Sequence, residues 1–436
     1  MADLSVKFAG LDFKNPVTIA AHAPSIPQRE LFSDEELSKW HMNIWRKYYE
    51  GDVGALTTGT IFAEEMPMGR GAHRLCPVST KGFAEKEGFL GSATMPDIMF
   101  PRTPGIMAVE KAKKEFTDMR VIAGIMGPGT DPEGWGQLAL EAEQAGADAV
   151  ELNVGSVMFM DTQDQAIRGI MSKRNLPSGV SIGLVPEVVA NIVKGIKKKV
   201  SIPVIVKITP ELGFHGLLGA LSIYREAKVD GLTCIHSLMT IAPPDIYNGG
   251  KTTYPHFSKT TWWGTVSLGG RWTCYRDVAC VAKYAPDIDV EACGGLVTPE
   301  HSVEALMLGA KLVQQSSGIF YNGISYPGRV VKFLKKYMDE QGYKSMNEVI
   351  GLAQQYIVEM GEMQEEYKSQ IGRLIAHVDY DKCVGTDACR ICLDTWCAAT
   401  YEENGVAKVD PKRCCACYLC VYRCPHGARS LSYIDK

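Results

Sequence analysis

The chain has 436 residues, with 46 lysine and arginine residues against 50 aspartate and glutamate residues. The resulting formal net charge of −4 gives no basic surface of the kind that binds nucleic acid or anionic membranes. The N-terminus lacks a basic segment followed by an apolar one, and no apolar run approaches the ~18 residues of a membrane span. The sequence therefore predicts a cytoplasmic protein, long enough for one large domain and one small domain.

Eight short apolar segments are predicted as strands, and several are followed directly by a segment with helical periodicity. Because the strands are nearly continuous runs of Val, Ile, Ala and Leu, we expect both of their faces to be buried, as in a parallel sheet. The predicted strands are residues 16–21, 53–58, 120–125, 148–153, 203–208, 230–235, 288–292 and 311–315. The predicted helices are residues 34–50, 132–145, 186–199, 216–227, 273–284, 299–308 and 327–341.

This alternation predicts an α/β fold, a (β/α)8 TIM barrel over residues 1–345. An open doubly wound sheet is the alternative, but it would normally carry a G-x-G-x-x-G turn after an early strand, and the sequence has none there. The polar, Gly- and Pro-rich stretch from Glu64 to Pro104 is predicted to form loops over a site. Residues 346–376 are predicted as a connector with a helix over Asn347–Ile371, and residues 377–436 as a separate domain.

The last two predicted strands end in small residues. In a barrel, chemistry takes place at the carboxyl ends of the strands, and a phosphate is often held after strands 7 and 8. Small residues let backbone N–H groups and serine hydroxyls reach a phosphate. A glycine pair alone is often only a turn, but small residues at both expected strand ends favour a phosphate site. The residues concerned are Gly294, Gly295, Ser316 and Ser317.

Polar residues stand at the carboxyl ends of three other predicted strands. A lysine inside a buried strand is costly unless it is paired, so Lys207 is predicted to meet an anion or a polar heterocycle, with a salt bridge in the barrel core as the alternative. Asn153 offers amide donors and an acceptor, and Ser156 begins a loop long enough to close over a substrate. His236 follows the sixth strand and is predicted to belong to the site, although a lone histidine is often structural.

Nine of the 14 cysteines lie between Cys383 and Pro425. The second run, Cys-x2-Cys-x2-Cys-x3-Cys-Pro, matches the bacterial ferredoxin pattern, in which the fourth cysteine ligates the other of two clusters. Structural zinc and disulfides are the alternatives, but zinc does not need this chained pattern and no secretion signal is present. We therefore predict a ferredoxin-type domain over residues 377–436 with two [4Fe–4S] clusters, in a reducing and oxygen-sheltered environment. The predicted ligands are Cys383, Cys389, Cys392 and Cys424 for cluster I and Cys397, Cys414, Cys417 and Cys420 for cluster II, which leaves Cys415 spare.

These residues, in this order, resemble the dihydroorotate/dihydropyrimidine dehydrogenase family, in particular the iron–sulfur subunits of bacterial NAD-dependent dihydropyrimidine dehydrogenases. The resemblance covers nearly the whole chain. It includes residues 4–10, 146–149, 207–210, 294–295, 337–353 and the terminal cysteine module.

The resemblance implies that the barrel binds FMN and that the clusters feed it electrons from a flavoprotein subunit with FAD and a nicotinamide site. We expect this subunit or another electron donor as the partner, in a homodimer or heterotetramer. The resemblance places Lys207 at the N1–C2=O side of the flavin and the small residues after strands 7 and 8 at the phosphate. Further cofactor contacts that it implies are Ala20, Ala21, Thr58, Gly59, Thr60, Asn153, His236 and Gly269. The substrate contacts that it implies are Glu64, Arg70, Asn153 and Ser237.

The chain departs from the family's pattern at the substrate side. Ser156 stands where the pyrimidine enzymes have a catalytic cysteine, and the proline that follows that cysteine is lost. Thr58-Gly59-Thr60 replaces Thr-Lys-Thr, and the asparagines that clamp a pyrimidine are replaced near Glu64 and by His236. These differences favour a substrate other than uracil.

We therefore expect hydride transfer between FMN and an activated C=C or ring bond of a small planar substrate. Ser156 would deliver the proton through a relay, with His236, Glu64 or Glu65 as candidates, because serine alone is a poor acid at neutral pH. One alternative is a divergent dihydropyrimidine dehydrogenase subunit that acts on pyrimidines. Another is a subunit without catalysis that serves electron transfer or scaffolding.

Overall fold

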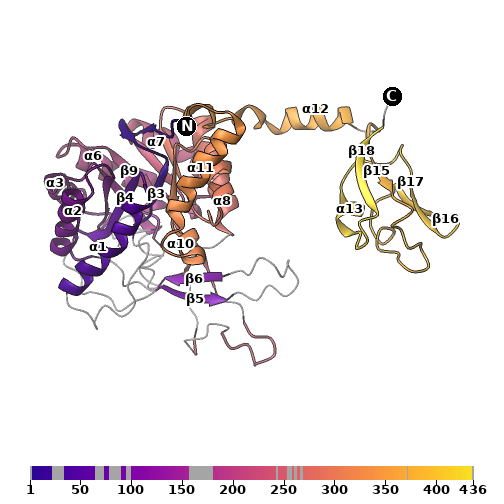
Figure 1. Ribbon diagram of the computed structural model, residues 1–436, viewed down its shortest axis with the longest axis horizontal. Helices are drawn as coiled ribbons and strands as arrows, with labels where there is room; N and C mark the ends of the chain where they lie inside the picture. Colours follow the sequence, from indigo (N-terminus) through magenta and orange to yellow (C-terminus); the bar gives the residue numbers. More distant parts are fainter. Residues whose placement is uncertain are drawn as a thin grey trace. The chain divides into compact units, whose positions relative to one another are not determined.

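The chain folds into two compact units, which we call the barrel unit (Met1–Gln354) and the cysteine unit (Gln355–Lys436). Both are shown in the computed structural model of Figure 1. The structure describes residues 2–21, 34–63, 73–77, 90–94, 100–156, 180–241, 244–252, 258–259, 263–265, 269–370 and 372–434.

Eight parallel strands close a barrel, and each one overlaps with a predicted strand. The last strand pairs with the first, with Gln314 opposite Thr18, so the open doubly wound alternative is wrong. The strands are β3 (Val17–Ile19), β4 (Ala55–Phe62), β7 (Arg120–Met126), β8 (Ala149–Asn153), β9 (Val204–Lys207), β10 (Gly231–Cys234), β13 (Asp289–Cys293) and β14 (Leu312–Gln315).

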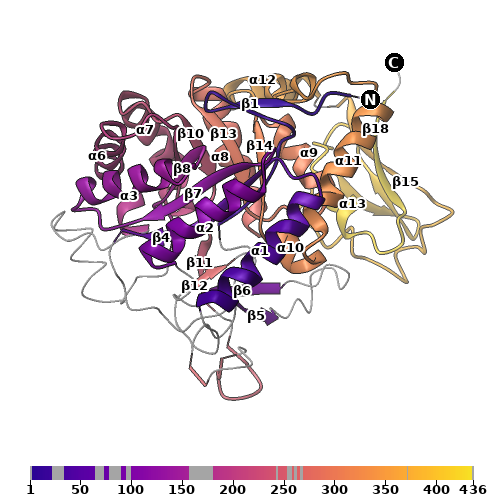
Figure 2. The same cartoon turned by 60° about the vertical axis from the view of Figure 1, so that its left-hand side comes forward.

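Helices surround the barrel (Figures 1 and 2). Their starts follow local sequence signals: Asp131 accepts a hydrogen bond from the Gly134 N–H at 2.9 Å, and Pro132 occupies the first turn that follows. Trp135 in that helix is fully buried against the sheet. The main helices are α1 (Asp34–Glu50), α2 (Arg102–Glu115), α3 (Pro132–Gln144), α6 (Pro186–Lys197), α7 (Gly213–Glu226), α8 (Gly270–Tyr284), α9 (Pro299–Met307) and α11 (Tyr326–Gln341), with the shorter α5 (Val180–Gly183), η2 (Pro210–Leu212) and α10 (Ser317–Asn322) between them.

A hairpin of β1 (Val6–Phe8) and β2 (Leu11–Phe13) packs at the start of β10. A Cβ atom at Gly231, the first residue of β10, would lie 2.7 Å from the Phe8 ring, so the ring fills the space that a side chain would need. Phe8 and Phe13 are both buried and meet edge to face, with ring centroids 6.2 Å apart. The hairpin therefore closes the amino end of the barrel.

The prediction of loops alone between Glu64 and Pro104 was wrong, because this stretch contributes two strands and the start of α2. The strands join a four-stranded sheet in the order β11 (Leu238–Thr240), β12 (Trp263–Thr265), β6 (Leu90–Thr94) and β5 (His73–Pro77). β6 and β12 come from excursions after β4 and β10, the second and sixth strands around the barrel, and Thr265 pairs with Ala93. The small sheet thus joins excursions from opposite sides of the barrel's carboxyl end.

The cysteine unit contains two antiparallel strand pairs, β15 (Leu374–Val378) with β18 (Arg429–Tyr433) and β16 (Thr400–Glu403) with β17 (Val406–Val409). It also contains the short helix α13 (Leu419–Arg423). Ile375, Ala376, Ala399, Cys414 and Cys420 form its small buried core.

The predicted helix over Asn347–Ile371 was too long. Only α12 (Met360–Gln370) is α-helical, and two 3₁₀ turns precede it, η3 (Met346–Glu348) and η4 (Gln354–Tyr356). Gly351 lies between these turns at φ +78°, a left-handed conformation that breaks a helix.

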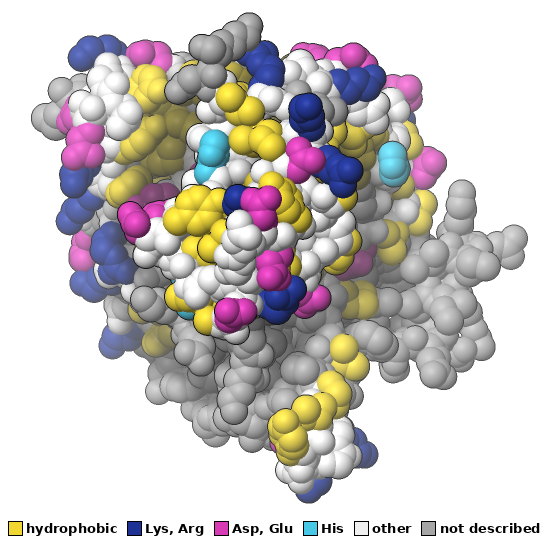
Figure 3. All heavy atoms as spheres, turned by 90° about the vertical axis from the view of Figure 1, so that its right-hand side faces the viewer, with side chains coloured by type: hydrophobic (Ala, Val, Ile, Leu, Met, Phe, Trp, Pro, Cys, Tyr) yellow, Lys and Arg dark blue, Asp and Glu magenta, His cyan; other side chains and the backbone are white. Residues whose placement is uncertain are grey.

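No helix in the described ranges is both long and apolar enough to cross a membrane. On the face shown in Figure 3, acidic, basic and hydrophobic side chains are mixed.

Candidate active site

A layer of hydrogen-bonded polar side chains lies inside the barrel near the carboxyl ends of its strands. Lys207 on β9 is only 6% exposed and donates a hydrogen bond to the Gln314 side-chain oxygen on β14. Its Nζ lies 3.8 Å from Glu151 Oε1 on β8. The Gln314 amide donates to Glu151 Oε2 at 2.9 Å and to Glu291 Oε2 at 3.2 Å. Lys207 is thus paired within the barrel, as the salt-bridge alternative expected, and the layer includes two carboxyl groups that sequence reasoning did not single out.

The two carboxyl groups share one hydroxyl. Thr233 Oγ1 lies 2.9 Å from Glu151 Oε2 and 2.9 Å from Glu291 Oε2, although a hydroxyl has a single proton to donate. A protonated carboxyl group resolves this, because it can donate to the threonine oxygen. Burial raises the pKa of Glu291 to about 7, and the charge of Glu151 raises it too. Glu291 is therefore the group that holds a proton up to neutral pH.

The ammonium of Lys207 stays charged in this layer. Burial lowers the pKa of Lys207, whereas Cys293 and the two carboxyl groups raise it and leave it above its ordinary value. Burial also raises the pKa of Cys293 to about 11, so that thiol is neutral near pH 7 and the carboxyl groups are the partners that matter. The layer combines one ammonium with one carboxylate and one titrating carboxyl group.

Glu291→Gln is expected to stabilise the barrel unit at pH 8 and to have a much smaller effect at pH 5.5. The folded-state pKa of Glu291, about 7, lies above its ordinary value of 4.5, so the folded protein binds this proton more tightly than the unfolded chain. Wild-type stability therefore falls as pH rises from about 4.5 to about 7, by up to about 3 kcal/mol at ~1.4 kcal/mol per pH unit. Unfolding midpoints of both proteins at the two pH values measure this loss.

The exposed Glu340, which is 3.5 Å from Lys336 on α11, provides the control for this measurement. Glu340→Gln is expected to shift the midpoint equally at pH 5.5 and pH 8. A Glu291→Gln variant whose midpoint runs parallel to wild type across this range would show that the pKa of Glu291 is not raised into this range by folding.

Three residues predicted for the site meet at the end of β8. The Asn153 side-chain amide donates to Thr60 Oγ1 at 3.1 Å, and Asn153 Oδ1 accepts the N–H of Ser156 at 3.2 Å. Ser156 is 1% exposed, and its Oγ has no hydrogen-bond partner among the described residues. A buried hydroxyl without a partner costs free energy, which a bound molecule that hydrogen-bonds to it would recover.

His236 lies beside this corner as a neutral imidazole. Its Nδ1 accepts the N–H of Ser237 at 2.7 Å, so the ring proton is on Nε2. Burial lowers the pKa of His236 to about 3, and the charge of Lys207 lowers it further. A Cβ atom at Gly155 would lie 2.5 Å from the His236 Cβ, so only glycine fits before Ser156. His236 at neutral pH is therefore a hydrogen-bond donor rather than a base.

The predicted flavin segments after β3 and within β4 are buried at the same end of the barrel. β4 changes register between Thr58 and Ile61, and Gly59 there has φ +101° with no room for a Cβ atom beside Gly124 O. Thr58 donates to Ile122 O, whereas Thr60 reaches Asn153. The remaining predicted contacts, Ala20 and Ala21, are buried directly after β3.

The segments after β13 and β14 contact each other, as a phosphate site requires. Gly294 and Gly295 have φ values of +128° and +70°. A Cβ atom at Gly318 would lie 2.7 Å from the Leu296 carbonyl oxygen, which shows how closely the two backbones approach. Ser316 immediately precedes α10, and Ser317 is 3% exposed. Small residues and backbone amides from both strand ends are thus available to one anion.

Four further predicted residues remain, of which the structure describes one. Gly269 is exposed just before α8. Glu64, Glu65 and Arg70 lie outside the described residues.

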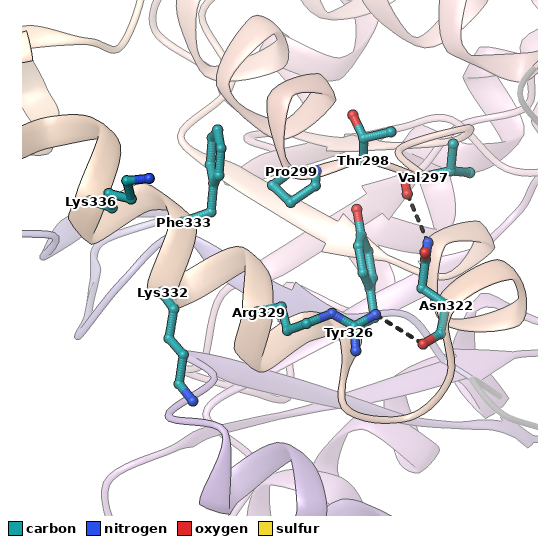
Figure 4. Close-up of a pocket in the computed structure, with 9 residues that line it drawn as sticks. All are labelled: Val297, Thr298, Pro299, Asn322, Tyr326, Arg329, Lys332, Phe333 and Lys336. Atoms are coloured by element: carbon teal, nitrogen blue, oxygen red, sulfur yellow. Dashed lines mark hydrogen bonds between the residues drawn. The ribbon is translucent and has the colours of Figure 1, made fainter. Parts of the chain in front are cut away.

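A groove of about 420 Å³ lies between α9 and α11 (Figure 4). Arg329 donates to the Asn322 carbonyl oxygen at 2.9 Å, and the Asn322 side chain donates to Val297 O at 2.8 Å. None of the residues that line the groove belongs to the predicted site. The lining residues are Val297, Thr298, Pro299, Asn322, Tyr326, Arg329, Lys332, Phe333 and Lys336.

Cysteine sulfurs from both predicted ligand sets gather in the cysteine unit. Cys414 and Cys420 belong to the buried core of this unit, and Cys392 and Cys397 pack against that core, so residues from both predicted ligand sets lie close together. Ala376 N donates to Cys414 Sγ at 3.4 Å, and such N–H···S contacts stabilise thiolates.

In the described part of the chain, no three His, Cys, Asp or Glu side chains could hold one metal ion together.

Known proteins are similar to this chain in sequence. The family model described as dihydroorotate dehydrogenase matches residues 137–338. The NAD-dependent dihydropyrimidine dehydrogenase subunit PreA of Escherichia coli (strain K12) is 25% identical over 99% of this chain and 96% of its own length. The dihydroorotate dehydrogenase B (NAD(+)) catalytic subunit of Pyrococcus furiosus is 32% identical over 58% of this chain and 75% of its own length. That of Pyrococcus abyssi is 28% identical over 80% of this chain and 99% of its own length.

A closed barrel with a polar site at the carboxyl ends of its strands, together with these relatives, defines a flavoprotein oxidoreductase that acts on CH–CH bonds. The chain belongs to the dihydroorotate dehydrogenase family.

Proposed function

We propose that the chain is the FMN-binding iron–sulfur subunit of an enzyme that transfers hydride between FMN and an activated C=C or ring bond of a small planar substrate. Electrons reach the site through two [4Fe–4S] clusters. The observation that carries the proposal is the Ser156 hydroxyl, buried without a described partner beside the Asn153–Thr60 pair. A relative named as a dihydropyrimidine dehydrogenase subunit that matches 99% of the chain supports it.

The residues fit FMN at two points. Lys207 presents a charged donor at the end of β9 for the N1–C2=O side of the flavin, where negative charge would be stabilised. Gly294, Gly295, Ser316 and Ser317 would hold the phosphate through backbone amides and hydroxyls. When bound, FMN supplies the hydride chemistry. The cysteine unit offers eight predicted cluster ligands, with sulfurs that accept backbone N–H groups.

Ser156 would carry the proton to or from the substrate carbon, and Asn153 orients it by accepting its backbone N–H. Serine is a weak acid, so the proton must be passed on. His236 would donate to substrate or to a relaying water through Nε2, because its Nδ1 is occupied by Ser237 N–H. Its pKa of about 3 keeps it neutral across the physiological range.

The substrate is proposed to be a planar unsaturated or aromatic ring other than uracil. A site built to hydrogen-bond particular ring groups loses about 10⁴-fold when those groups go unmatched, and the pyrimidine-clamping asparagines are mostly replaced here. A divergent dihydropyrimidine dehydrogenase is the second candidate, since the E. coli relative bears that name. A scaffold without catalysis is disfavoured because nothing structural requires Asn153, Thr60 and Ser156 to meet in one buried corner.

The electron source is proposed to be a separate flavoprotein subunit with FAD and an NAD(P)H site, within a homodimer or heterotetramer. The sequence has no dinucleotide-binding turn of its own. The E. coli and Pyrococcus relatives are each named as a subunit of an NAD-linked enzyme.

Anaerobically purified protein is expected to contain FMN and about eight irons per chain, as two cubane clusters require. Dithionite should bleach the flavin, and NADH should do so only slowly without a partner subunit. Reoxidation of the reduced protein is then followed with planar rings bearing hydroxyl, carbonyl or carboxylate groups, and with uracil and thymine as controls. The proposal would be contradicted if the protein contained zinc in place of iron. It would also be contradicted if uracil reoxidised the flavin as fast as the most active of the planar ring compounds does.

A further inference from the structure

A buried arginine lies among the cysteine sulfurs. Arg429, the first residue of β18, is 6% exposed, and its Nη2 donates to Cys392 Sγ at 3.0 Å. Its Nη1 is buried without a hydrogen-bond partner, and no carboxylate forms an ion pair with it among the residues that the structure describes. Burying a cation away from any counter-charge is strongly unfavourable, so the guanidinium requires an anion at this position.

The sulfurs supply that anion. Cys392 belongs to the predicted ligand set of cluster I, and the neighbouring Ala428 N–H donates to Cys424 Sγ of the same set at 3.3 Å. Residues 428 and 429 therefore contact two of the four predicted cluster I ligands.

We propose that Arg429 is a positioning residue that raises the reduction potential of cluster I. The inference rests on the proposed function, because it takes the two clusters as present. Each one-electron reduction adds a negative charge to the cluster and its thiolates, with no proton transferred. A buried guanidinium hydrogen-bonded to Cys392 Sγ stabilises the reduced form more than the oxidised form, since the local dielectric is low and no carboxylate offsets its charge.

The test is a redox titration of the full chain, purified anaerobically and followed by electron paramagnetic resonance. Arg429→Gln should lower the equilibrium constant for reduction of cluster I about tenfold, which is about 59 mV for a one-electron couple. Cluster II should shift less. Arg429→Lys keeps the charge and is expected to stay within about twofold of wild type.

Arg373→Gln is the matched control. Arg373 is exposed and precedes β15, and Leu374 pairs with Tyr433 at the opposite end of the two strands from Arg429. Arg373→Gln removes one positive charge from the same strand pair, but at a position exposed to solvent. It should leave the reduction potentials of both clusters unchanged.

The outcomes separate the two proposals. Wild-type protein without iron would defeat the proposed function itself. Iron-loaded Arg429→Gln protein with an unchanged cluster I potential would overturn the role of Arg429, as would an equal shift in Arg373→Gln. If the Arg429→Gln protein does not retain iron, the Arg429→Lys protein is the test. An iron content and a cluster I potential near those of wild type support the role of the positive charge. A tenfold change in the equilibrium constant for reduction of cluster I refutes it.

Discussion

Lys207→Met is expected to destabilise the barrel unit by about 3–5 kcal/mol and to prevent flavin retention, because it leaves buried carboxyl groups without a counter-charge. The Lys207 ammonium lies 3.8 Å from Glu151 Oε1 and donates to Gln314, whose amide in turn donates to both Glu151 and Glu291. Unfolding midpoints measure the loss of stability, and the absorbance of bound flavin after gel filtration measures retention. The loss should be larger at pH 8 than at pH 5.5, where Glu291 takes up a proton.

Two further variants make this result specific. Lys336→Met removes an exposed lysine from α11, 3.5 Å from Glu340, and is expected to cost less than about 1 kcal/mol. Glu291→Gln combined with Lys207→Met removes one of the stranded carboxyl groups, and should recover about 1–3 kcal/mol through the coupling of neighbouring sites. A Lys207→Met protein with the stability of the Lys336→Met control would mean that Lys207 is not the counter-charge of this layer.

The barrel could be predicted from the sequence because each of its strands is a short apolar run followed by connecting polar residues. Lys207 was recognisable for the same reason, since a lysine inside such a run must have a partner. Glu151 and Glu291 escaped recognition although alternation along a strand carries the signal. Glu151 is two residues before Asn153 and Glu291 two residues before Cys293, so each shares an inward face with a strand-end residue.

Other features depend on contacts between distant parts of the chain. Ala93 pairs with Thr265, and Asn153 donates a hydrogen bond to Thr60. Both contacts join residues that are far apart in the sequence, and no local sequence pattern predicts either of them. The buried position of Arg429 is of the same kind, because only the pairing of β18 with β15 brings it to Cys392. Local periodicity predicted the strands of the barrel and most of the helices around it, and long-range packing decided which polar groups meet.

Ser156→Ala is expected to slow reoxidation of the reduced flavin by substrate ~10²-fold or more, the usual scale of a lost acid–base group, while leaving reduction by dithionite unchanged. Stability should hardly change, because Ser156 Oγ has no hydrogen-bond partner among the described residues that alanine would leave unmatched. Ser156→Cys should retain turnover, since a thiol can hold the same proton. Stopped-flow reoxidation, with flavin absorbance as the readout, separates the three proteins.

Ser302→Ala gives the opposite pattern and serves as the control for Ser156. Ser302 is fully buried in α9, and its Oγ accepts a hydrogen bond from the Gln315 amide at 3.2 Å. Its loss should lower stability by about 1 kcal/mol and leave reoxidation at the wild-type rate. A Ser156→Ala protein that is reoxidised as fast as Ser302→Ala would place the proton donor elsewhere. The Nε2–H of His236 is then the candidate, because the His236 Cβ lies beside Gly155, the residue before Ser156.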